Sequence, residues 1–201
     1  MKTDLTEIIF LLDRSGSMGG FESDTIGGFN AFLEKQRQLP GNTIVTVVLF
    51  DDQYEILWNG VDAAQVKLTD KEYYVRGTTA LLDALGKTIL AVSHRLAVTN
   101  KEERPGKVIF VITTDGLENA SCEFTYRKVK ELIQQQQEKH GWEFIFLGAN
   151  IDATQEAASI GIARNNAYKF QASGAGVKEM YCIAFEAVKE KRFVKGKKNN
   201  Q

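Results

Sequence analysis

Strand-like apolar runs alternate with helix-like segments along the whole chain, and this alternation constrains the fold more than any other feature. Short apolar or β-branched runs predict six strands, at 8–12, 44–50, 54–58, 108–113, 142–147 and 167–170. Apolar residues spaced by three or four predict helices between these runs, at 29–36, 79–97, 124–140, 154–160 and about 177–190. The order of elements is therefore β-α-β-β-α-β-α-β-α-β-α.

An order of this kind predicts an α/β protein with a mainly parallel sheet and helices on both faces. The short polar connection at 51–53 joins two of the runs and predicts a hairpin, so that one strand is antiparallel to its neighbour. No linker rich in Pro, Gly or Ser divides the chain. We therefore expect a single domain at residues 1–192, followed by a basic and flexible tail at 193–201.

Composition excludes several classes of partner and site. Lys and Arg number 25 against 26 Asp and Glu, and this balance argues against nucleic acid as a partner. Cys122 and Cys182 lie far apart and form no C-x-x-C pair, which argues against a thiolate metal site. No apolar run is long enough for a membrane span, and the run that ends before Asp13 is too short for a signal peptide. We therefore expect a cytoplasmic protein.

Carboxylates and hydroxyls follow two of the predicted strands and precede the long helix at 79–97. Asp13, Ser15 and Ser17 follow the first run, Asp115 follows the run at 108–113, and Thr79 stands at the start of the helix. Ligands of open α/β sheets gather beyond the carboxyl ends of the strands. An oxygen-only donor set favours a hard cation such as Mg²⁺ or Mn²⁺. The sequence thus predicts a metal site in which these five residues leave one ligand position open.

These residues lie in three motifs that resemble the von Willebrand factor type A (vWA) family. Residues 13–17 read D-R-S-G-S and match the D-x-S-x-S motif, residues 77–85 resemble the second element, and residues 113–116 resemble the third. The resemblance covers about residues 6–191. It implies a Rossmann-like three-layer α/β/α fold with one antiparallel edge strand. It also implies a metal-ion-dependent adhesion site (MIDAS) that binds Mg²⁺.

The resemblance further implies a function in protein binding. In this family an acidic residue of the partner often completes the coordination of the metal, so we expect a protein partner that offers a carboxylate. Thr78 stands where the family often has a second glycine, and the Ala-Leu pair that follows indicates Thr79 as the ligand. We expect Met18, Phe21 and Arg76 to form an exposed rim beside the metal. Intracellular relatives often work with an ATPase or within another complex.

The alternative interpretation is a metal-assisted hydrolase or phosphotransferase of Rossmann-like fold. Haloacid-dehalogenase-like enzymes also place an aspartate after the first strand, but they normally have a second acid where Ser15 stands here. No general base is evident near the loops, and the sequence has neither a P-loop nor a G-x-S-x-G motif. We therefore expect no catalytic residues and a binding module rather than an enzyme.

Overall fold

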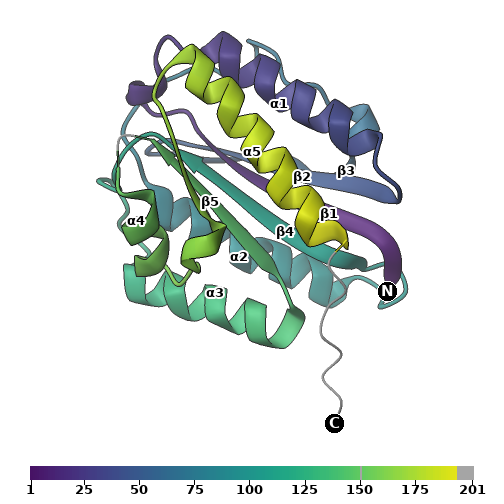
Figure 1. Cartoon of the computed structure of the whole chain (residues 1–201). Helices are drawn as coiled ribbons and strands as arrows, with labels where there is room; N and C mark the ends of the chain where they lie inside the picture. Colours follow the sequence, from purple (N-terminus) through teal and green to yellow (C-terminus); the bar gives the residue numbers. More distant parts are fainter. Residues whose placement is uncertain (150, 194–201) are drawn as a thin grey trace.

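The computed structural model describes residues 1–149 and 151–193, so residues 194–201 of the expected tail lie outside the described part of the chain. Six strands and five α-helices follow one another in the predicted order (Figure 1). They are β1 (Lys2–Asp13), α1 (Glu22–Arg37), β2 (Asn42–Phe50), β3 (Tyr54–Asp62), α2 (Leu81–Val98), β4 (Pro105–Thr114), α3 (Tyr126–His140), β5 (Glu143–Ala149), α4 (Ala153–Ser159), β6 (Ala167–Phe170) and α5 (Gly174–Phe193).

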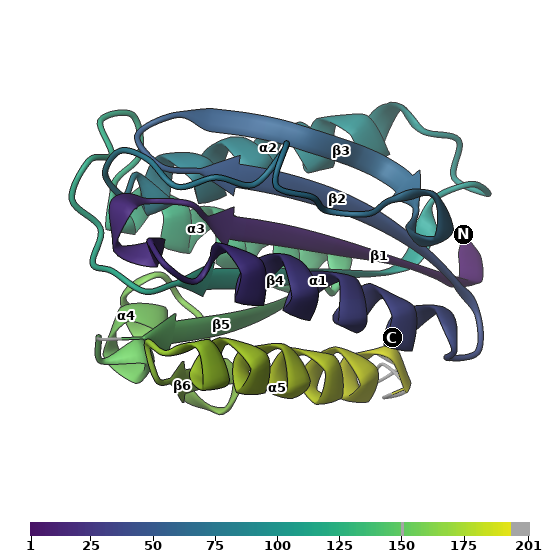
Figure 2. The same ribbon diagram turned by 90° about the horizontal axis from the view of Figure 1, so that it is seen from above.

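The strands form one sheet in the order β3-β2-β1-β4-β5-β6. All neighbouring strands are parallel except β2 and β3, whose antiparallel pairing places β3 at one edge. Helices α1 and α5 lie on one face of the sheet, and α2, α3 and α4 lie on the other (Figures 1 and 2). The predicted three-layer α/β/α fold with one antiparallel edge strand is confirmed.

Strand β1 is longer than the apolar run predicts, because a buried glutamate continues it toward the N-terminus. Glu7 is fully buried and pairs with Val108 of β4 and Ile44 of β2 in the sheet register. Arg95 of α2 donates a hydrogen bond to its carboxylate, and so does the hydroxyl of Thr46 on β2. In the sequence, Glu7 interrupts the apolar pattern that predicts the strand. In the structure, its buried charge is paired with Arg95 between the sheet and α2.

Apolar side chains alternate between the two faces of the sheet and form a core on each side. On the face of α1 and α5, Phe10 of β1 packs edge-on against Phe29 and Phe32, with ring centroids 5.3 and 5.0 Å apart. Helices α1 and α5 approach closely at Gly28, where a Cβ would lie 2.2 Å from the ring of Tyr181. This close contact requires glycine, and it fixes α5 against α1 over the sheet.

The sheet order reverses between β1 and β4, which makes their carboxyl ends the expected ligand site of such a fold. Asp13 is the last residue of β1, and Asp115 directly follows β4. The two carboxylates therefore start from neighbouring parallel strands. Among the described residues, no helix is both long enough and apolar enough to cross a membrane.

Candidate metal centre

Asp13 lies buried at the end of β1, with both carboxylate oxygens engaged. Its Oδ1 accepts a hydrogen bond from the backbone N–H of Ser15 at 2.7 Å, and its Oδ2 accepts one from the hydroxyl of Thr114 at 2.7 Å. Burial raises the pKa of Asp13 to about 6, and the charge of Asp115 adds to this rise. The carboxylate is thus buried and fixed in place by two hydrogen bonds.

The two serines of the first loop join Asp13 to Asp115. The loop turns through a short 3-10 helix at Gly16–Met18, which brings Ser15 Oγ within 3.1 Å of Ser17 Oγ. The hydroxyl of Ser17 then donates a hydrogen bond of 2.6 Å to Oδ1 of Asp115. The hydroxyls and carboxylates of these residues therefore form one continuous cluster across the ends of β1 and β4.

Thr79 reaches the same cluster from the loop before α2. A Cβ placed on Gly116 would lie 3.6 Å from Thr79 Oγ1 and 3.5 Å from Ser17 Oγ, so both hydroxyls face the same small space. Thr79 is buried, with 3% of its surface exposed, whereas Thr78 is exposed. The structure therefore brings together all five of the predicted residues, and it directs Thr79 rather than Thr78 toward them.

The donor set fits a hard cation on the evidence of Asp115. Its Oδ2 is buried and has no hydrogen-bond partner among the described residues, although its Oδ1 is held by Ser17. Burial raises the pKa of this carboxyl above its usual range. An unpartnered buried carboxylate oxygen beside a second buried carboxylate is costly unless a cation balances both. In the described part of the chain, no group of three or more His, Cys, Asp or Glu side chains is arranged to hold a metal ion, so this candidate site relies on two carboxylates and three hydroxyls.

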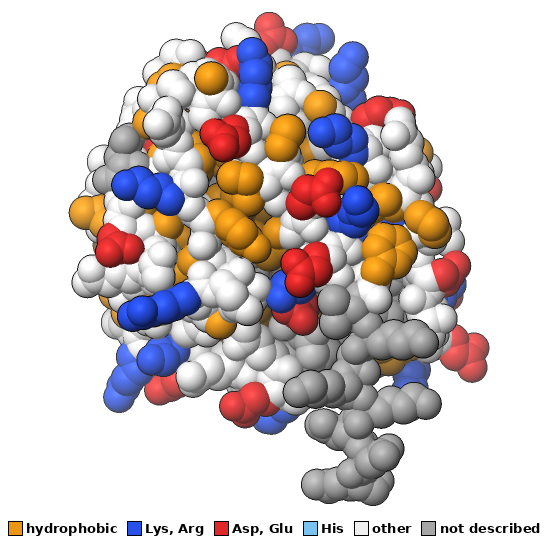
Figure 3. All heavy atoms as spheres, viewed as in Figure 1, with side chains coloured by type: hydrophobic (Ala, Val, Ile, Leu, Met, Phe, Trp, Pro, Cys, Tyr) orange, Lys and Arg blue, Asp and Glu red, His pale blue; other side chains and the backbone are white. Residues whose placement is uncertain are grey.

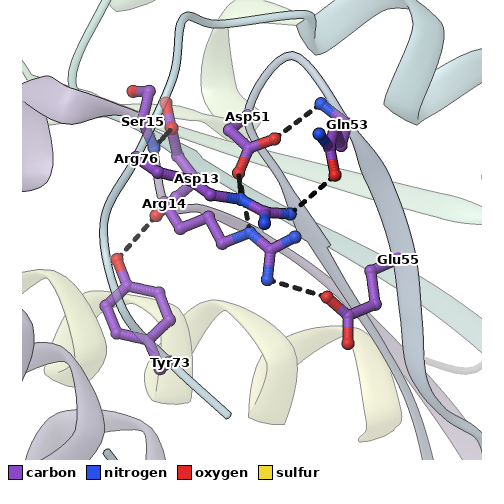
Figure 4. Close-up of polar contacts among 8 residues, drawn as sticks. All are labelled: Asp13, Arg14, Ser15, Asp51, Gln53, Glu55, Tyr73 and Arg76. Carbon is purple, nitrogen blue, oxygen red and sulfur yellow. Dashed lines mark hydrogen bonds and ion pairs between the residues drawn. The ribbon is translucent and has the colours of Figure 1, made fainter.

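A partly buried ion-pair network, which the sequence analysis did not identify, connects the first loop to β2 and β3 (Figure 4). Arg14 is fully buried and donates from Nε to Asp51 at 2.9 Å and from Nη1 to Glu55 at 2.8 Å. Arg76 donates from Nε to the same oxygen of Asp51 at 2.7 Å and from Nη2 to Gln53 at 3.0 Å. One buried carboxylate therefore joins the first loop to the loop that carries Thr79.

Tyr73 holds the backbone at the carboxyl end of β1. Its hydroxyl donates a hydrogen bond of 2.6 Å to the backbone carbonyl of Asp13 (Figure 4). The phenol is almost completely buried, and burial raises its pKa well above the usual range. Tyr73 therefore remains a neutral donor that fixes the backbone at the end of β1. Two adjacent tyrosines, Tyr73 and Tyr74, stand in this stretch, and nothing in the sequence indicates which of them has this role.

The loop after β4 and the start of α2 cap each other. Asn119 Oδ1 accepts from the N–H of Thr79 at 2.9 Å, while the carbonyl of Thr79 accepts from the N–H of Asn119 at 3.0 Å. Glu118 accepts from the N–H of Leu82 in the first turn of α2. In return, Asp83 accepts from three successive N–H groups, those of residues 122–124. These contacts fix Thr79 relative to Asp115, and no motif in the sequence predicts them.

The expected rim around the metal is only partly correct. Met18 is buried, with 5% exposure, and Phe21 is half-buried against the core beneath α1. Of the three residues expected there, Arg76 is half-exposed and lies on the ring of Tyr74, 5.5 Å from the centroid. Leu117, two residues after Asp115, is a large apolar side chain that is 60% exposed, and the sequence analysis did not single it out. The 3-10 turn at Gly16–Met18 explains the error, because it turns Met18 inward.

Comparisons with known proteins agree with the fold and identify the family of the chain. The family model of the von Willebrand factor type A domain matches residues 7–181, and the chain belongs to this family. A search of curated proteins gives no significant match.

Solved structures of similar fold share little sequence with the chain. The vWF domain of the type V pili tip protein Mfa5 from Porphyromonas gingivalis is 10% identical with a TM-score of 0.67, over 97% of this chain and 98% of that one. Proximal thread matrix protein 1 from the mussel byssus, in a structure with a zinc-occupied MIDAS motif, is 16% identical with a TM-score of 0.64. That match covers 91% of this chain and 45% of the mussel protein, so the chain spans less than half of that protein's length.

A third structure of similar fold is the ArnB paralog VWA2 from Sulfolobus acidocaldarius. It is 15% identical with a TM-score of 0.57, over 88% of this chain and 43% of that one. At these levels of identity the similarity concerns the fold alone.

Proposed function

We propose that this vWA domain binds a divalent cation, Mg²⁺ or Mn²⁺, and through it an acidic group on a protein partner. Asp13, Ser15, Ser17, Thr79 and Asp115 would hold the ion. The observation that carries the proposal is the buried Oδ2 of Asp115, which has no partner among the described residues and lies in the same cluster as the buried carboxylate of Asp13. A divalent cation balances the two negative charges and gives this oxygen a ligand role.

A bound cation would act as a Lewis acid that attracts a carboxylate from outside the protein. The residues of the chain provide two charged ligands and three neutral hydroxyls, so a sixth, strong oxygen donor is missing. Arg76, in the loop before Thr79, is half-exposed, and Leu117, two residues after Asp115, is exposed. A positively charged and an apolar neighbour suit a partner whose acidic residue stands beside an apolar one. Such a partner would belong to a larger complex, an ATPase complex among the possibilities.

The alternative of a metal-assisted hydrolase has less support from the geometry. Neither hydrogen-bond partner of the Asp13 carboxylate, the N–H of Ser15 or the hydroxyl of Thr114, is a general base. Ser15 itself contacts Ser17 and offers no second acid. The expected cytoplasmic location stays a prediction. The two cysteines are free and exposed, and this is compatible with a reducing compartment.

Calorimetry with metal salts tests the proposal. Titration of Mg²⁺ and Mn²⁺ into the metal-free protein should give one site, and Asp13→Ala should abolish it while circular dichroism stays unchanged. Asp70→Ala, an exposed aspartate away from the cluster, is the matched control and should bind as the wild type does. A parallel titration with Zn²⁺ shows which ion is preferred, because the structure of the mussel protein contains zinc. Equal affinity of Asp13→Ala and wild type would refute the assignment.

A further inference from the structure

A hollow of about 780 Å³ lies between the outer side of α5 and the edge strand β6. Its apolar lining comes from Tyr168 of β6 and from Ile183, Ala187 and Phe193 of α5. Phe193 is 52% exposed, and Figure 3 shows hydrophobic side chains at the surface in the middle of this face. None of the five proposed metal ligands lines this hollow. We call it the α5 groove.

Acidic side chains border the α5 groove. Glu179, Glu186 and Glu190 line it from exposed positions on α5. The lysine among the lining residues is Lys189, which lies 3.5 Å from Glu186 and is thus partly neutralised. Three glutamates and one lysine give the groove a formal charge of −2, although the whole chain has a net charge of only −1. The charge of this surface is therefore complementary to a basic partner.

The shape of the α5 groove favours a helix as its occupant. The lining residues of α5 from Glu179 to Phe193 recur every three or four positions, and they extend for about 21 Å at 1.5 Å per residue. Strand β6 has four residues, so an added strand would find few backbone groups to pair with. On this face of the sheet only α1 and α5 are present among the described residues, against three helices on the other (Figure 2).

We propose that the α5 groove binds a basic amphipathic helix of a partner protein. Apolar side chains at intervals of three and four residues would enter the hollow beside Ile183 and Tyr168. Lysines or arginines flanking this stripe would pair with Glu179, Glu186 and Glu190. This second surface is independent of the metal, so that the protein can hold an acidic partner at one end of the sheet and a basic helix along α5.

A model peptide tests this chemistry with the full chain. The probe is a labelled 18-residue helical peptide with leucines at three- and four-residue spacing and lysines elsewhere. The control peptide has glutamate at every lysine position. Fluorescence anisotropy at 0.15 M salt in EDTA should show binding of the lysine peptide and none of the glutamate peptide. The triple change of Glu179, Glu186 and Glu190 to Gln should weaken binding at least tenfold, and Ile183→Ser should weaken it to a similar extent.

The matched control changes the exposed Glu102, Glu131 and Glu138 to Gln, which alters the net charge by the same amount elsewhere on the surface. It should keep the affinity of the wild type. Equal losses in the two triple variants would show general charge attraction and overturn the proposal. Binding of the glutamate peptide with the same affinity as the lysine peptide would also overturn the proposal. A dimer in sedimentation velocity that Ile183→Ser dissociates would assign the groove to a second copy of the chain instead.

Discussion

Replacing Asp13 with asparagine should stabilise the metal-free protein and abolish its metal binding. The change removes one negative charge from the buried cluster with little change in shape. Asparagine keeps an oxygen for the N–H of Ser15, and its amide can donate to the hydroxyl of Thr114, which accepts as well as donates. The hydrogen bonds around the side chain are therefore retained while the charge is lost.

The magnitude follows from the pKa of Asp13. Burial raises it from 3.8 to about 6, in spite of the hydrogen bonds from Ser15 and Thr114 that favour the charged form. A tenfold change in a proton equilibrium is about 1.4 kcal/mol, so the ionised carboxylate costs the folded, metal-free protein up to about 3 kcal/mol. Because the pKa is raised on folding, the contribution of Asp13 to stability is complete below pH 3.8 and is lost as the pH rises through 6.

Urea unfolding in EDTA at several pH values measures this contribution. At pH 7.5 the Asp13→Asn variant should be more stable than the wild type by about 1–3 kcal/mol, and the difference should disappear near pH 4. Saturating Mg²⁺ should reverse the order, because it stabilises only the protein that binds it. Asp70→Asn, at an exposed position, controls for a general effect of charge. A less stable Asp13→Asn variant at pH 7.5 in EDTA would contradict the electrostatic account of the site.

Two further substitutions test the surroundings of the site, and a third tests the packing of α1 against α5. Asp51→Ala removes the carboxylate between two guanidinium groups, one fully buried, and should lower the free energy of unfolding by about 3 kcal/mol in urea titrations, against little change for the exposed Asp52→Ala. Asp83→Ala leaves three N–H groups without their acceptor, so it should lower the free energy of unfolding by about 1–3 kcal/mol and weaken Mg²⁺ binding. Unchanged metal affinity would show that the loop held by Asp83 does not position Asp115. Gly28→Ala places a methyl 2.2 Å from an atom of a buried ring and should cost about 1–3 kcal/mol in thermal unfolding, whereas Gly27→Ala, with open space around it, should not destabilise the protein.

The order of elements was predictable because apolar periodicity reports which side chains face the core. The strand at Ala167–Phe170 has the predicted bounds, and the hairpin of β2 and β3 follows from the short polar connection. The extent of the other strands was not predictable in the same way. Glu7 is polar in the sequence and buried in the structure, because its partner Arg95 is 88 residues away. Contacts of this kind are invisible to a local pattern.

The candidate site was predictable from ligand chemistry, since all five residues stand at strand or helix ends where the topology brings them together. The residues that position these five side chains were not predictable from the sequence. Asp51, Glu118 and Asn119 act through hydrogen bonds to loops distant in the sequence, and as polar residues in turns they have no distinctive spacing. The burial of Met18 was not predicted for a related reason. The sequence does not show the 3-10 helix at Gly16–Met18, in which the side chain of Met18 is buried.

Anomalous diffraction from crystals grown with Mn²⁺ tests the central claim most directly. The account predicts one strong manganese peak bounded by Asp13, Ser15, Ser17, Thr79 and Asp115, and predicts its absence in crystals of Asp13→Ala prepared in the same way. No peak among these five residues, or a peak held by other side chains, would contradict it.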